Sequence, residues 1–222
     1  MIGLSGCGPE HILTDWIGGV VSQSPKSMDH QKRTSLDAAA IPYGRRNIWK
    51  GKIKTENGWI EKDYGAAPFL PRLYGRICLH YEEVALRRLK GVEGVPVYMG
   101  RPTRNSIRMT RLPGIPLDKL KPGELSEICF RRFQDLVHAM HRSGVAHGDL
   151  HMRNILIHED HPSVIDYSVA YVRGRIPILD KALFRLFELL DLERLYKIEK
   201  AFFGTGTPPK MFYIYRLIKG VK

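Results

Sequence analysis

Cysteine is scarce in this chain of 222 residues, and the three that occur, Cys7, Cys78 and Cys129, are odd in number and far apart. Proteins held together by disulfides have more cysteines at closer spacing, so the sequence indicates reduced thiols. Long apolar segments are also missing, because no run approaches the roughly 20 residues of a transmembrane helix. We therefore expect a cytoplasmic protein, with contact at the inner face of the membrane as an alternative.

Positive charge, in contrast, is abundant, with a formal net charge of +12 at pH 7. Several of the cations fall in two groups in the first half of the chain: Lys50, Lys52, Lys54, Arg101, Arg104, Arg108 and Arg111. This excess predicts attraction to an anionic partner, which could be a nucleotide, a phosphorylated glycolipid, a membrane surface or RNA. Composition does not choose among these partners.

Three oxygen-bearing side chains follow one another closely after residue 147. Asp149 comes directly after Gly148, which permits the sharp turn that the chain needs there, and Asn154 is five residues further on. The apolar run 155–157 is followed by a polar segment that ends at Pro162, and residues 163–165 would return as the second strand of a hairpin. The hairpin would bring Asp166 back beside Asn154.

These residue types in this order suit phosphoryl transfer from ATP. Asp149 can orient an attacking hydroxyl, while Asn154 and Asp166 offer the oxygen ligands that magnesium prefers on nucleotide phosphates. Six of the nine histidines also lie between residues 138 and 161, but no cysteine joins them, so a zinc site is the weaker interpretation. The pattern predicts the catalytic loop of a kinase.

Residues 147–154 and 165–167 resemble the catalytic loop and the metal-binding Asp motif of the protein-kinase-like superfamily. The His-Gly-Asp-Leu-His form is most similar to the compact RIO-like and bacterial branches, including the lipopolysaccharide (Kdo and heptose) kinases. The resemblance covers about residues 41–190 and implies ATP and Mg2+ as cofactors. It also implies an α+β fold of two lobes, with a small antiparallel sheet and one helix in the first lobe and a short, mainly helical second lobe.

The resemblance places the first lobe at residues 41–112 and the second at 113–222, after a poorly structured leader at 1–40. The phosphate-covering lid of the wider family would fall at 42–47, which contains one glycine and two arginines. Residues 112–117 would form the crossing between lobes, where the family binds adenine through its backbone, which puts Thr110 to Leu112 near the base. Asp180 is the expected anchor of the second lobe.

The family also requires a lysine on the small sheet and a glutamate on a helix. Asn57-Gly58 is a strong hairpin signal between residues 48–53 and 59–64, which puts Lys62 on a strand as the candidate phosphate lysine. Apolar residues at steps of four predict a helix over 81–89. Either Glu82 or Glu83 could pair with Lys62. Glu82 fits the family pattern better, and Glu83 could instead pair with Arg87, four residues later.

The leading hypothesis is therefore an ATP- and magnesium-dependent phosphotransferase, with Asp149, Lys62 and Glu82 as catalytic residues. Lys62, Thr110, Leu112, Asn154 and Asp166 would bind the nucleotide, and Asn154 and Asp166 the metal. The acceptor would be the hydroxyl of a glycolipid sugar or of a protein Ser or Thr. The alternative is a kinase-fold module with little catalysis that binds a nucleotide or RNA.

Overall fold

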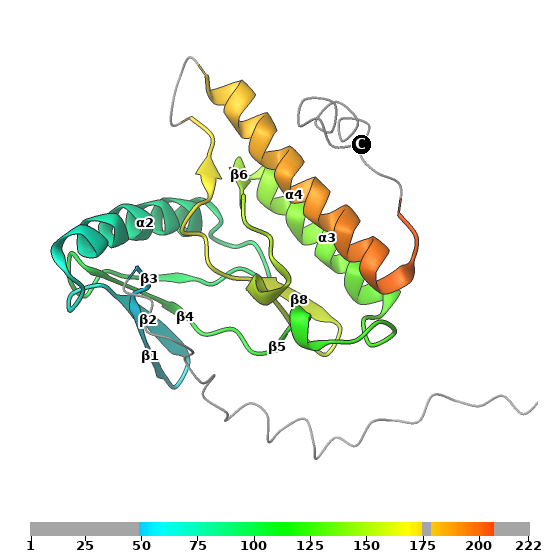
Figure 1. The fold of residues 1–222 in the computed structure, drawn as a ribbon, viewed down its shortest axis with the longest axis horizontal. Helices are drawn as coiled ribbons and strands as arrows, with labels where there is room; N and C mark the ends of the chain where they lie inside the picture. Colours follow the sequence, from blue (N-terminus) through cyan, green and yellow to red (C-terminus); the bar gives the residue numbers. More distant parts are fainter. Residues whose placement is uncertain (1–48, 175–178, 207–222) are drawn as a thin grey trace, which may run out of the picture. The chain divides into compact units, whose positions relative to one another are not determined.

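The computed structural model describes residues 49–174 and 179–206. The expected leader at 1–40 and the expected lid at 42–47 lie outside the described residues. The elements described below therefore belong to the two predicted lobes alone (Figure 1).

An antiparallel sheet forms the first lobe, with the strand order β1-β2-β4-β3. Its strands are β1 (Lys52–Glu56), β2 (Trp59–Asp63), β3 (Tyr98–Gly100) and β4 (Ser106–Thr110). Gly58 has φ +82° in the turn between β1 and β2, a backbone conformation that glycine adopts without strain. The predicted hairpin is confirmed, although its first strand lies at 52–56 and not at 48–53.

The helix α2 (Phe69–Arg88) lies against β3 and β4 and is much longer than the predicted 81–89. Its first half contains Pro71 and Gly75, which ordinarily argue against a helix. Pro71 is in the first turn, where a missing N–H removes no helical hydrogen bond. At Gly75 a side chain would overlap the ring of Tyr64, so the glycine allows the strand end to approach the helix.

Two helices and two small sheets make up the second lobe. The helices α3 (Glu127–Arg142) and α4 (Asp180–Phe203) lie side by side (Figure 1). One sheet consists of β5 (Ile115–Pro116), β7 (Ile155–His158) and β8 (His161–Val164), and the other of β6 (Val145–Ala146) and β9 (Tyr171–Val172). Short 3-10 helices, η1 (Leu117–Lys119) and η2 (Met152–Asn154), complete the lobe.

The predicted signals for α3 and for the β7-β8 hairpin are confirmed. Ser126 caps the start of α3 by accepting a hydrogen bond from the N–H of Cys129 at 3.0 Å, and Gly144 with φ +75° follows its end. Ile155 pairs with Val164 in the hairpin. The register therefore returns residue 166 close to residue 154, as the sequence predicts.

One buried apolar cluster runs through both lobes. It includes Leu79 and Leu86 of α2, Val137 and Met140 of α3, and the ring of Tyr167. Cys78 and Cys129 are buried free thiols. Within the described part of the chain, no helix combines the length and the apolar character needed to cross a membrane.

Candidate active site

Lys62 lies where three separate elements meet. Its Nζ is 2.6 Å from Oε1 of Glu82 and 2.9 Å from Oδ1 of Asp166. Lys62 comes from β2, Glu82 from α2, and Asp166 from the segment after β8. The structure thus brings together three of the residues that the sequence singled out, although Lys62 and Asp166 are 104 positions apart in the chain.

Glu83, the other candidate partner of Lys62, faces a different set of groups. It accepts hydrogen bonds from Nε of Arg87 and from the hydroxyl of Tyr98, both at 3.0 Å. Nη1 of Arg101 also lies 3.4 Å from its second oxygen. Glu82 is therefore the partner of Lys62, which the sequence alone could not decide.

Burial and charge act against each other in this network. Burial raises the pKa of Glu82 above its usual value, and the nearby Lys62 only partly offsets this effect. Burial alone would lower the pKa of Lys62, but Glu82 and then Asp166 raise it above its usual value. Lys62 in turn holds the pKa of Asp166 far below its usual range. At neutral pH we therefore expect a charged lysine beside an ionised Asp166.

The catalytic loop is held by hydrogen bonds around His147, whose side chain is fully buried. Nδ1 of His147 accepts from the N–H of Asp149 at 3.2 Å, and Nε2 lies 3.0 Å from the carbonyl oxygen of Ile165. Because Nδ1 accepts, the ring proton is on Nε2, which donates to Ile165. His147 thus ties the loop that carries Asp149 to the segment that carries Asp166.

Asn154 and Asp166 are suited to hold a magnesium ion. Nδ2 of Asn154 donates to the carbonyl oxygen of Asp149 at 3.0 Å, and since that oxygen can only accept, the amide oxygen is left for another ligand. The N–H of Ile165 donates to the carbonyl of Asn154 at 2.9 Å, which keeps the two segments together. Asp166 has φ +68°, an uncommon backbone conformation that Asp tolerates better than most residues.

Two protein oxygens suit magnesium, which ordinarily keeps waters and binds substrate phosphates as well. Among the described residues no group of three or more His, Cys, Asp and Glu side chains could hold a metal ion. The histidines near the loop are used otherwise: Nε2 of His141 is 2.9 Å from Asp191, and Nε2 of His151 is 3.0 Å from Oδ1 of Asp149. His151 therefore lies beside the predicted catalytic carboxylate.

Asp191 of α4 anchors the catalytic loop, and sequence reasoning missed it. Its carboxylate is fully buried and accepts from the N–H groups of His147 at 2.7 Å and Gly148 at 2.8 Å. Asp180, the expected anchor, instead accepts from the N–H of Gly174 at 2.6 Å and the hydroxyl of Tyr171 at 2.9 Å. Asp180 therefore joins the start of α4 to the end of β9 within the second lobe, whereas Asp191 holds the loop.

The crossing between the lobes offers fewer backbone groups than expected. The N–H of Thr110 donates to Val97 and that of Arg111 to Gly58, at 2.9 and 3.0 Å. The N–H of Leu112 donates to no backbone group in the described part of the chain. If adenine binds here, Leu112 is the better donor, and Thr110 serves the sheet.

A comparison with protein families finds a match over part of this arrangement. Residues 72–175 match the model of the RIO domain, and this range includes Glu82, Asp149, Asn154 and Asp166. This segment, slightly less than half of the chain, is similar to a RIO-type, protein-kinase-like domain. Lys62 precedes the matched segment, so its place in the site rests on the geometry above.

A curated relative matches part of the chain. It is a probable bifunctional tRNA threonylcarbamoyladenosine biosynthesis protein from Thermoplasma acidophilum, 36% identical over 100 residues. The match spans 43% of this chain and only 18% of that protein. The similarity therefore concerns one part of a much longer relative.

A solved structure shows the same fold. The Rio2 kinase from Chaetomium thermophilum, crystallised as an ADP/Mg2+-phosphoaspartate complex, matches with a TM-score of 0.54 and 14% identity. The match covers 86% of this chain and 65% of that one. The predicted α+β, protein-kinase-like fold is confirmed. These relatives support the RIO-like branch of the prediction and give no support to the lipopolysaccharide-kinase branch.

Replacing one carboxylate oxygen of Asp191 with an NH2 group tests whether Asp191 anchors the loop. In Asp191→Asn the new amide NH2 must face a backbone N–H or His141, so we expect a loss of about 2 to 3 kcal/mol in the free energy of unfolding. Urea denaturation measures this loss. Glu188→Gln, on the same helix and paired with Arg185, is the control and should change stability by less than about 0.5 kcal/mol. Equal effects of the two substitutions would contradict the role.

The buried network predicts a stability difference that depends on pH. Lys62→Met removes the cation that lowers the pKa of Asp166. Above about pH 4, where an unfolded Asp is ionised, Lys62 stabilises the folded wild type, and the variant lacks this stabilisation. In the variant Glu82 has no cationic partner, so its buried side chain is more stable when it is protonated. Acid therefore also raises the stability of the variant relative to the wild type. The contribution of Asp166 is lost as pH falls below the pKa of an unfolded Asp, so the difference in unfolding free energy should shrink as pH falls from about 5 to about 2. A difference that is constant over this range would contradict the network.

Proposed function

We propose that this protein is an ATP- and magnesium-dependent phosphotransferase that phosphorylates a hydroxyl group of a protein Ser or Thr. The observation that carries the proposal is the convergence of Lys62, Glu82 and Asp166, next to a loop that presents Asp149 and Asn154. RIO-type proteins form an ATP-binding, kinase-like family, and the Rio2 structure contains ADP and Mg2+. The glycolipid acceptor has no support from the relatives, and contact with a membrane stays a prediction.

In the proposed reaction Lys62 holds the phosphates, with Glu82 fixing its ammonium. Asn154 and Asp166 would hold magnesium, which neutralises charge on the phosphates when it is bound. Asp149 orients the acceptor hydroxyl. The hydroxyl oxygen bonds to the γ-phosphorus, the bond from that phosphorus to the bridging oxygen of ADP breaks, and the hydroxyl proton passes to Asp149. His151, at 3.0 Å from Asp149, can help to hold the carboxylate in place.

The second candidate function is a nucleotide-binding module with little catalysis that acts together with RNA. The similarity to a protein named for tRNA modification favours it. The intact network of Lys62, Glu82 and Asp166 opposes it, because a module without catalysis has no need of a buried charge network that costs free energy to form.

Loss of the Asp149 carboxylate distinguishes the two candidates. We expect Asp149→Asn to lower the turnover of radiolabelled ATP on a protein acceptor mixture by about a hundredfold or more, a typical contribution of a positioned base. Asp135→Asn, an exposed Asp on α3, is the matched control and should retain wild-type turnover. The same residual turnover in wild type and Asp149→Asn would remove the proposed role of Asp149.

A further inference from the structure

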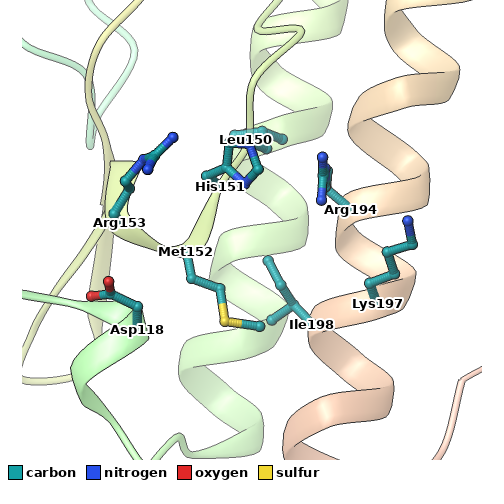
Figure 2. Close-up of a pocket in the computed structure, with 8 residues that line it drawn as sticks. All are labelled: Asp118, Leu150, His151, Met152, Arg153, Arg194, Lys197 and Ile198. Carbon is teal, nitrogen blue, oxygen red and sulfur yellow. The ribbon is translucent and has the colours of Figure 1, made fainter.

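A pocket of about 300 Å³ lies directly beside the catalytic loop. Leu150 and Met152 from the loop and Ile198 from α4 provide its apolar lining (Figure 2). His151 also lines the pocket, and its Nε2 is 3.0 Å from Oδ1 of Asp149. A molecule in the pocket would therefore be next to the carboxylate that we propose to orient the acceptor.

Three cations from two elements surround this apolar lining. Arg153 belongs to η2, and Arg194 and Lys197 extend from neighbouring turns of α4 on the other side of His151 (Figure 2). Lys197 is 2.8 Å from Glu193, so part of its charge is compensated. Arg153 and Arg194 form no ion pair with any described residue, although Arg194 is half-buried.

The cations of the first lobe differ in this respect. Arg108 lies 2.8 Å from the buried Glu61 and stacks on the ring of Trp59, and Arg101 lies 3.4 Å from Glu83. Part of the positive patch that the sequence suggested there is thus neutralised within the protein. The guanidinium groups of Arg153 and Arg194, in contrast, have no carboxylate partner among the described residues and lie at the pocket beside the catalytic loop.

We propose that this pocket binds an oxyanion, a carboxylate or a phosphate, that the acceptor carries close to its reactive hydroxyl. The inference rests on the proposed function, because it assigns the pocket to the acceptor of that reaction. Guanidinium groups bind both oxyanions through paired hydrogen bonds, and the apolar lining suits the carbon atoms next to the charged group. The protein would then select Ser or Thr in acidic or phosphorylated segments.

A single anionic group fits the pocket better than a nucleic acid strand. Strand binding needs a continuous row of cations along the phosphates. Here Asp118 lines the same pocket, and Glu193 lies beside Lys197, so carboxylates interrupt the positive surface within a few residues. Further phosphates of a strand would meet these negative charges.

Binding of small probes tests the pocket without requiring turnover. N-acetyl amides of phosphoserine, glutamate and serine are titrated by NMR into the full-length protein with saturating MgADP, which keeps the probes from the nucleotide site. We expect the two charged probes to bind more tightly than the serine probe. Arg153→Ala and Arg194→Ala should each weaken that binding about tenfold, as loss of a charge-assisted hydrogen bond does.

Arg185→Ala is the matched control, since Arg185 is on α4 but pairs with Glu188 and does not line the pocket. It should leave probe binding unchanged. The tighter of the two charged probes identifies the oxyanion. The inference is overturned if the Arg153→Ala/Arg194→Ala variant binds phosphoserine within twofold of wild type, or if the serine probe binds as tightly as the charged ones. It is also overturned if the double substitution weakens binding of single-stranded RNA and not of the probes.

The two proposals can fail separately. Probe binding that depends on both arginines, with no phosphoryl transfer to any acceptor, would keep the pocket and remove the phosphotransferase. Phosphoryl transfer to acceptors that is unaffected by the double substitution would keep the phosphotransferase and remove the role of the pocket.

Discussion

The ammonium of Lys62 between the carboxylates of Glu82 and Asp166 is the interaction on which the rest of the site depends. Removing one member of a buried ion pair typically costs about 3 to 5 kcal/mol, because the remaining charge is left without a partner. The strand β2, the helix α2 and the segment after β8 must therefore come together for the buried charges of Lys62 and Glu82 to be tolerated. The packing that closes the protein core also assembles the proposed phosphate side of the site.

A second set of hydrogen bonds connects the predicted catalytic loop to α4 and to the segment after β8. Asp191 accepts from the backbone of His147 and Gly148, and His147 in turn connects the loop to Ile165. Gly148 has φ +75°, and a side chain there would lie 2.8 Å from the ring of Phe187. The one helix α4 thus supports both the loop and the pocket beside it. A short second lobe can position Asp149 because its few contacts are buried and directional.

Local signals predicted the parts of the fold that local chemistry determines. The Asn57-Gly58 turn, the cap at Ser126 and the β7-β8 hairpin each follow from a few adjacent residues. The start of α2 did not, because Pro71 and Gly75 are tolerated only through their position in the first turn and against Tyr64. Asp191 was missed since it lies 44 residues from His147 within a long helix and belongs to no motif. The pocket could not be predicted from the sequence for the same reason, because its cations come from elements that are far apart in the chain.

The central claim is that Lys62, Asn154 and Asp166 form a site for ATP with magnesium. Isothermal titration calorimetry of ATP, with Mg2+ and then with EDTA, tests this claim most directly in the wild type and in Asp166→Asn. The account predicts that Mg2+ strengthens ATP binding to the wild type about tenfold or more, and that Asp166→Asn removes most of this difference. ATP affinity that is the same with and without Mg2+ in the wild type would contradict it.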